Sequence, residues 1–136
     1  IKHRNHLGIM TASATFVTVG TVINFSDGST PIYQRYADQQ PTKLSSDGKM
    51  MMKAGNCNCD GFIRATGPCN PLNCANDFQN ISAELNNVLF QNGVYKFHDI
   101  NMDGILRKTG PLLSNDFQLL MSLIGHPVNI IKEHLP

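Results

Sequence analysis

The chain has 136 residues, of which 41% are hydrophobic and 15% charged, and its formal net charge is +1. This length fits one domain, or a small β unit joined to a small helical one, with enough apolar residues for a core. The near-neutral charge, without a cluster of Lys or Arg, argues against nucleic acid as a partner. No apolar stretch is long enough for a membrane span.

The N-terminal part has the pattern of a β-rich segment. Apolar and polar side chains alternate over residues 1–9, and β-branched and aromatic residues fill 13–19 and 21–25. A further short strand is expected over 31–36. We therefore predict a strand-rich, sandwich-like part, whose free leading strand would add to the sheet edge of a neighbouring molecule.

The second half has helical periodicity. Two apolar runs recur with a period of about 3.6, and each follows an Asn-Asp pair that can cap a helix. The apolar positions are Phe78, Ile81, Leu85, Val88 and Leu89 in the first expected helix, and Phe117, Leu120, Leu123 and Ile124 in the second. The expected fold class is α+β, with a β-rich, sandwich-like part over residues 1–50 and two loop-helix repeats over 51–136.

The most specific feature is a duplicated segment, residues 56–68 and residues 99–111. Each copy has Asn or Asp at three alternate positions before a Gly, and each leads into Asn-Asp-Phe-Gln. Alternating oxygen donors followed by Gly form the front half of an EF-hand calcium loop. Since the pattern occurs twice, we predict two calcium loops.

The second copy carries the fuller set of calcium ligands. Position 12, where an EF-hand has a bidentate carboxylate, is Gly110 here, so we expect an expanded loop in which residues 107–114 bulge out. The expected ligands are the side chains of Asp99, Asn101, Asp103 and Asp116 and the carbonyl of Ile105.

The first copy is expected to bind calcium more weakly, because it has fewer carboxylates. Its expected ligands are the side chains of Asn56, Asn58, Asp60 and Asp77 and the carbonyl of Phe62. Both ions would act structurally, by neutralising clustered carboxylates, so that binding energy becomes folding energy. The alternative is a pair of Asx-rich turns that only cap the helices.

Four cysteines lie within 18 residues: Cys57, Cys59, Cys69 and Cys74. An even, closely spaced set indicates an oxidising compartment, and hence secretion. Two disulfides would tie the bulge of the first loop, either 57–69 with 59–74 or 57–74 with 59–69. A four-thiolate zinc site is the alternative.

No catalytic signature is present in the sequence, whether a Ser nucleophile elbow, HExxH, a phosphate loop or a triad pattern. His3 and His6 would lie on opposite faces of the expected first strand, where they could not readily share a metal ion. We therefore expect a protein that is not an enzyme.

The loop-helix duplication resembles dockerin-type modules in the pattern Asp99-x-Asn101-x-Asp103-Gly104. Its expanded form, over residues 107–116, is similar to repeats of large bacterial surface proteins exported by the type IX route. The resemblance implies two calcium-bound loop-helix units packed antiparallel, with calcium ligands at Asp99, Asn101, Asp103 and Asp116 and at the matching positions of the first copy.

The predicted function is that of a non-catalytic, extracellular calcium-binding structural module of a cell-surface protein or of a self-assembling surface filament. The alternatives are a dockerin-like module that docks into a receptor protein, and an accessory domain of a secreted carbohydrate-active enzyme. A protein partner or self-association is expected in each case, without nucleic acid.

Overall fold

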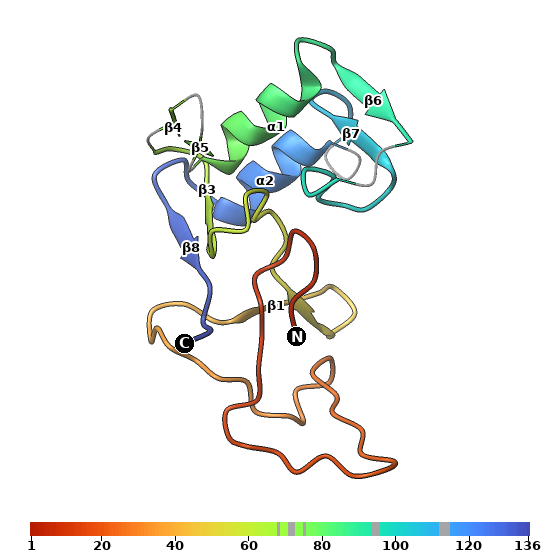
Figure 1. Ribbon diagram of the computed structural model, residues 1–136, viewed down its shortest axis with the longest axis vertical. Helices are drawn as coiled ribbons and strands as arrows, with labels where there is room; N and C mark the ends of the chain where they lie inside the picture. The colour runs from red at the N-terminus through yellow and green to blue at the C-terminus, as the bar shows by residue number, and fades with distance from the viewer. Residues whose placement is uncertain (68, 71–72, 75, 94–95, 112–114) are drawn as a thin grey trace.

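The computed structural model describes the chain apart from residues 68, 71–72, 75, 94–95 and 112–114. Within the described residues, two short helices and four two-stranded antiparallel sheets form the regular structure (Figure 1). The elements are β1 (Thr42–Leu44), β2 (Met50–Met52), β3 (Phe62–Arg64), β4 (Cys69–Asn70), β5 (Asn73–Cys74), α1 (Asp77–Leu85), β6 (Phe90–Asn92), β7 (Ile105–Arg107), α2 (Asp116–Ile124) and β8 (Ile130–Lys132).

The sheet pairings join the two repeated loops to different parts of the chain. β3, in the first loop, pairs with β8 near the C-terminus, with Ile63 opposite Ile131. β7, in the second loop, pairs with β6, with Leu106 opposite Gln91. The remaining pairs, β1 with β2 and β4 with β5, are local. The strands of the two loops therefore do not pair with each other.

Both helices begin where the sequence predicts. The side-chain oxygen of Asn76 accepts the backbone N–H of Gln79 at the start of α1, and Asn115 does the same for Gln118 at the start of α2. Each Asn thus satisfies one of the N–H groups that a helix leaves without an internal partner. Neither described helix is long and apolar enough to cross a membrane.

The first helix ends earlier than its apolar pattern suggests. It stops at Leu85, because Asn86 and Asn87 both adopt left-handed φ angles of 44° and 69°. Asn tolerates this conformation better than most residues, so it ends helices as Gly does. Val88 and Leu89, which we expected on the helix, lie beyond it and are exposed.

The N-terminal segment is not strand-rich. Residues 1–41, all of which the structure describes, contain no strand, and only isolated bridges join His6 to Ala54 and Thr11 to Ile32. In Figure 1 much of this segment extends below the helices as irregular chain. The sandwich-like part of the predicted fold is therefore wrong.

The β-branched segment 13–25 illustrates the reason. It reverses direction near Gly20, where Thr21 N–H donates to the Thr18 carbonyl at 3.0 Å, but no strand pairing joins its two arms. Its apolar side chains face solvent, with Phe16 95% exposed. Strand propensity reflects fit to a paired, half-buried surface, so a segment without partner or core stays irregular.

The second part of the predicted fold class also needs correction. The helices α1 and α2 are present, but the second half is not a simple pair of loop-helix repeats, because short strands in both loops pair with elements outside the repeats. The observed architecture is a set of small antiparallel sheets around two short helices. The predicted α+β fold of a sandwich followed by two calcium loop-helix repeats is therefore contradicted.

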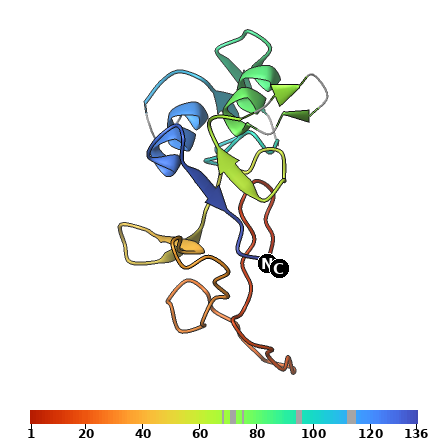
Figure 2. The ribbon, with the colours of Figure 1, turned by 90° about the vertical axis from the view of Figure 1, so that its left-hand side faces the viewer.

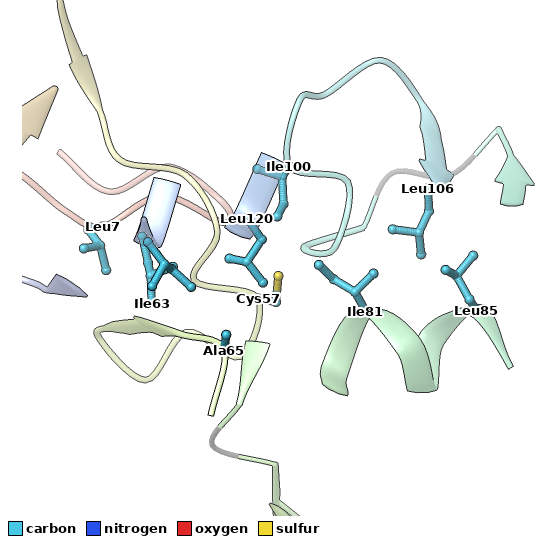
Figure 3. Packing of buried hydrophobic residues seen from close by; sticks show 10 residues of the cluster. Leu7, Cys57, Ile63, Ala65, Ile81, Leu85, Ile100, Leu106 and Leu120 are labelled. Atoms are coloured by element: carbon cyan, nitrogen blue, oxygen red, sulfur yellow. The ribbon is translucent and has the colours of Figure 1, made fainter. Parts of the chain in front are cut away.

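The core lies between the helices and the repeated loops (Figure 3). Ile81 and Leu85 project from α1 toward the side of the second loop that carries Leu106. Equivalent positions of the two loops supply equivalent core residues, Cys57 with Ile100 and Ile63 with Leu106. The buried cluster consists of Leu7, Cys57, Ile63, Ala65, Ile81, Leu85, Ile100, Leu106, Leu120 and Ile124.

The N-terminal and C-terminal segments are joined by hydrogen bonds, and Figure 2 shows β8 and the chain after it running toward the N-terminus. Gly8 N–H donates to the Glu133 carboxylate at 2.7 Å, and the Lys2 ammonium lies 3.3 Å from the same carboxylate. Leu7 is buried in the core cluster. The first residues are therefore anchored to the second half, and not only to their neighbours in sequence.

Candidate functional site

The two repeated loops, residues 56–64 and 99–107, share one backbone conformation. The fourth residue of each, Cys59 or Met102, has a left-handed φ of 60° or 59°, and the sixth is a Gly with a φ of 81° or 80°. Left-handed φ at a residue other than Gly costs about 1 kcal/mol or more. Its recurrence at the same position indicates that equivalent contacts hold both loops.

A buried carboxylate closes the first loop. Asp77, the first residue of α1, is fully buried. Its Oδ1 accepts the N–H of Cys57 at 2.7 Å, and its Oδ2 accepts the N–H of Arg64 at 2.9 Å. These are the second and ninth residues of the loop, so one side chain spans it.

Asp116, the first residue of α2, does the same in the second loop. It is fully buried and accepts the N–H of Ile100 at 2.7 Å and the N–H of Arg107 at 2.8 Å. The structure thus places both predicted closing residues against their loops, although the predicted bulge that includes residues 112–114 lies partly outside the described residues.

The side chains at the third and fifth positions stabilise the turns themselves. In the first loop Asn58 Oδ1 accepts the N–H of Asp60 at 3.2 Å, and Asp60 Oδ1 accepts the N–H of Phe62 at 2.9 Å. The second loop has the same two bonds, at 3.2 and 2.8 Å, among Asn101, Asp103 and Ile105. These bonds are Asx turns, the alternative to calcium binding that the sequence leaves open.

The first loop has an internal counter-charge. The Arg64 guanidinium lies 2.5 Å from Asp60 Oδ2, which leaves that carboxylate less free to attract a cation. Asn56 replaces a carboxylate at the first position, and its Oδ1 accepts the N–H of Asp60 at 3.1 Å. Both features make this loop the weaker candidate for a cation.

The second loop contains a buried carboxylate oxygen without a hydrogen-bond partner. Asp99 is 1% exposed. Its Oδ2 accepts the N–H of Gly104 at 3.1 Å, whereas its Oδ1 is buried and has no partner. The Arg4 guanidinium lies 3.8 Å from Oδ2. An unpaired buried acceptor on an ionisable group is unfavourable, and a bound cation would remove the penalty.

Asn5 joins the two loops, which the sequence did not predict. Its side-chain amide donates to the Asp99 carbonyl at 2.7 Å. Its own carbonyl accepts the N–H groups of Gly55 at 2.8 Å and Asn56 at 2.9 Å. One fully buried residue therefore holds the first residue of each loop. No local pattern could reveal this contact, because Asn5 and Asp99 are 94 residues apart.

Replacement of Asn5 by Ala should lower the free energy of unfolding by about 1–3 kcal/mol, because the Asp99 carbonyl would lose the closer of its two donors and keep only the Arg4 guanidinium at 3.3 Å. Chemical denaturation with a chelator present measures the change. Asn92→Ala, at an exposed position on β6, is the matched control and should change the free energy by less than about 0.5 kcal/mol. Equal effects of the two substitutions would show that Asn5 does not support the loops.

Burial changes the ionisation of both closing carboxylates. It raises the pKa of Asp77 to about 7, although the N–H groups of Arg64 and Cys57 favour the charged form. Burial also raises the pKa of Asp116, against the opposing N–H groups of the second loop. A nearby cation would lower both pKa values, since it favours the ionised form.

The donor chemistry of the loops suits a hard cation, because the predicted ligands are all oxygen atoms. In the described part of the chain no three or more His, Cys, Asp or Glu side chains are gathered as a metal site. Asp99, Asp103 and Asp116 thus do not converge in this conformation. The unpartnered Asp99 Oδ1 nevertheless fits a cation ligand.

The cysteines of the first loop are free thiols. Cys57 is buried in the core and Cys59 is exposed. Burial raises the pKa of the Cys57 thiol, which makes it less reactive. Cys69 and Cys74 lie opposite each other on β4 and β5, but their side chains lie outside the described residues. Both predicted disulfide pairings use Cys57 and Cys59, and neither residue forms a disulfide in this structure. The pairings and the zinc alternative stay predictions.

The candidate site therefore consists of two equivalent loops, each closed by a buried carboxylate and joined through Asn5. Comparison of the chain with the models of known protein families, with curated proteins and with solved structures gives no match.

Proposed function

We propose that this chain is a non-catalytic structural module that binds calcium in its two repeated loops, with the second loop binding more tightly. The observation that supports this most directly is the buried Asp99 carboxylate, whose Oδ1 has no partner, in a loop closed by the buried Asp116. Two buried carboxylates in one short loop favour a divalent counter-ion.

The second loop would hold the ion through its oxygen donors: Asp99, Asn101, Asp103, the carbonyl of Ile105 and Asp116. Calcium, when bound, supplies positive charge that offsets the burial of these carboxylates. The chain's own contribution is to fix the loop: Asn5 holds its first residue, and Asp116 holds the backbone at Ile100 and Arg107.

The first loop would use Asn56, Asn58, Asp60, the carbonyl of Phe62 and Asp77. Its affinity should be lower because affinity follows the charge of the ligands. Arg64 also neutralises part of the charge of Asp60.

Isothermal titration with calcium tests the proposal. The wild-type chain should take up calcium, and its melting temperature should rise with calcium and fall with a chelator. Asp99→Asn should weaken the tighter binding event at least about tenfold, or about 1.4 kcal/mol. Asp38→Asn, which removes an exposed carboxylate outside both loops, is the charge-matched control and should leave binding unchanged.

Absence of both calcium uptake and a chelator effect on the melting temperature would refute the proposal. Uptake that Asp99→Asn and Asp38→Asn weaken equally would place the ion outside the second loop.

The oxidising environment inferred from the cysteines is the basis for proposing an extracellular, cell-surface location. Self-association by strand addition stays a prediction. The leading residues, which were predicted to supply this strand, are anchored to the second half through Leu7 and Gly8. The strand would therefore have to come from segment 13–25, which pairs with no other strand among the described residues and whose side chains Phe16, Val17, Val19 and Val22 are exposed.

A further inference from the structure

A tight turn brings two imidazoles together at the start of the chain. The N–H of His6 donates to the carbonyl of His3 at 2.7 Å, and the two ring centroids are 5.1 Å apart. Arg4, inside the turn, has a φ of 21°. The predicted strand would have placed His3 and His6 on opposite faces, so the turn reverses that expectation.

The two rings approach through their nitrogen atoms. His3 Nδ1 and His6 Nδ1 are 3.2 Å apart, and the ring planes meet at 72°. Two nitrogens bound to one zinc ion at their usual bond lengths, with a tetrahedral angle between them, are about 3.3 Å apart. The pair therefore already has the separation that a shared metal ion requires.

The protonation state of His6 also suits a ligand. Burial, followed by the charges of His3 and Arg4, lowers the pKa of His6 to about 4. His6 is therefore neutral at pH 7, which is the form that binds metals. No proton needs to be displaced from a charged ring when an ion binds.

The surroundings permit entry of an ion but oppose very tight binding. His3 is exposed and His6 half-buried, which leaves coordination positions open to water. The Arg4 guanidinium would repel a dication, although it is 3.8 Å from the carboxylate of Asp99, which offsets part of its charge. Within the described residues, no third His, Cys, Asp or Glu completes the set.

We propose that His3 and His6 form a two-nitrogen site for a borderline transition-metal ion such as Zn²⁺, separate from the calcium loops. Imidazole nitrogen suits zinc, whereas calcium requires oxygen ligands. In the metal-free turn one Nδ1 donates its proton to the other. On binding, that ring takes the Nε2–H tautomer, both Nδ1 lone pairs coordinate the ion, and no net proton is released.

The test is a titration with Zn²⁺ in millimolar calcium, so that oxygen sites are already occupied. His3→Ala, at the exposed position, should keep the fold and weaken Zn²⁺ binding at least about tenfold. His126→Ala removes an exposed His elsewhere and should leave binding unchanged. Cys59→Ser should also retain binding, which distinguishes imidazole from thiolate ligation.

A second readout comes from NMR of the imidazole ring protons. Zn²⁺ should shift the signals of His3 and His6 together and leave those of His126 in place. The inference is overturned if His3→Ala binds Zn²⁺ as tightly as His126→Ala, or if Cys59→Ser alone loses binding. Asp103→Asn removes a proposed calcium ligand but leaves the ion pair of Arg4 with Asp99 in place. It should therefore weaken calcium binding without changing Zn²⁺ affinity, so failure of the calcium proposal and failure of this one are distinguishable.

Discussion

Replacement of Asp116 by Ala is expected to lower the free energy of unfolding by about 2–5 kcal/mol, even without calcium. The Asp116 carboxylate accepts the N–H groups of Ile100 and Arg107, and the side chain is fully buried. Its removal leaves two donors without partners, and each buried unsatisfied donor costs about 1–3 kcal/mol. The substitution also removes the desolvation cost of burying the carboxylate, which offsets part of this loss of stability.

Urea denaturation in excess chelator measures the effect of Asp116→Ala without a contribution from metal binding. Asp103→Ala is the matched control in the same loop, because Asp103 is exposed and should cost less than about 1 kcal/mol. Asp77→Ala should resemble Asp116→Ala, since Asp77 closes the first loop through equivalent bonds. A cost for Asp116→Ala no larger than that for Asp103→Ala would show that the buried carboxylate does not fix the loop.

The contribution of Asp77 to stability should decrease as pH rises. Burial raises its pKa from the ordinary value of 3.8 to about 7. Between these values the folded protein keeps a proton that the unfolded chain releases. The contribution of Asp77 to stability is therefore fully present below about pH 4 and is lost as the pH rises through 7. A shift of about three pKa units corresponds to about 4 kcal/mol.

The measurement must isolate Asp77, because His6 acts in the opposite direction. Its pKa is lowered from 6.5 to about 4, so its contribution is present above 6.5 and is lost as pH falls. The difference in unfolding free energy between wild type and Asp77→Asn cancels the His6 term. Between pH 4 and pH 8 in chelator, the free energy of unfolding of wild type should fall relative to that of Asp77→Asn. Calcium should make this fall smaller. A difference independent of pH would mean that Asp77 keeps an ordinary pKa.

The loops were the most predictable part of the molecule because their contacts are local. Asn at the start of each helix accepts an N–H three residues later, and Gly61 and Gly104 adopt the positive φ angles that the turns require. Each of these interactions joins residues that are neighbours in sequence. The repeated Asn, Asp and Gly pattern therefore specifies both turns and both helix starts.

The N-terminal half was less predictable because strand propensity does not supply a partner strand. Segment 13–25 has β-branched residues at the right positions, yet none of the described strands pairs with it and most of its apolar side chains remain exposed. Apolar and polar residues alternate over 1–9 and predicted a strand, but the chain there forms a turn that brings His3 and His6 together. A pair of strands is stable only where burial of apolar side chains stabilises it in addition to the backbone hydrogen bonds.

The sequence by itself determined two Asx-rich turns, each followed by a capped helix, because every contact involved spans only a few residues. The tertiary structure decided which groups complete those turns: Asn5 reaches Asp99 across 94 residues, and β8 pairs with β3 at the far end of the chain. Such contacts depend on which buried polar groups find partners when the chain collapses. No short segment contains that information, because the two partners are distant in sequence and lose their water together only when the chain folds.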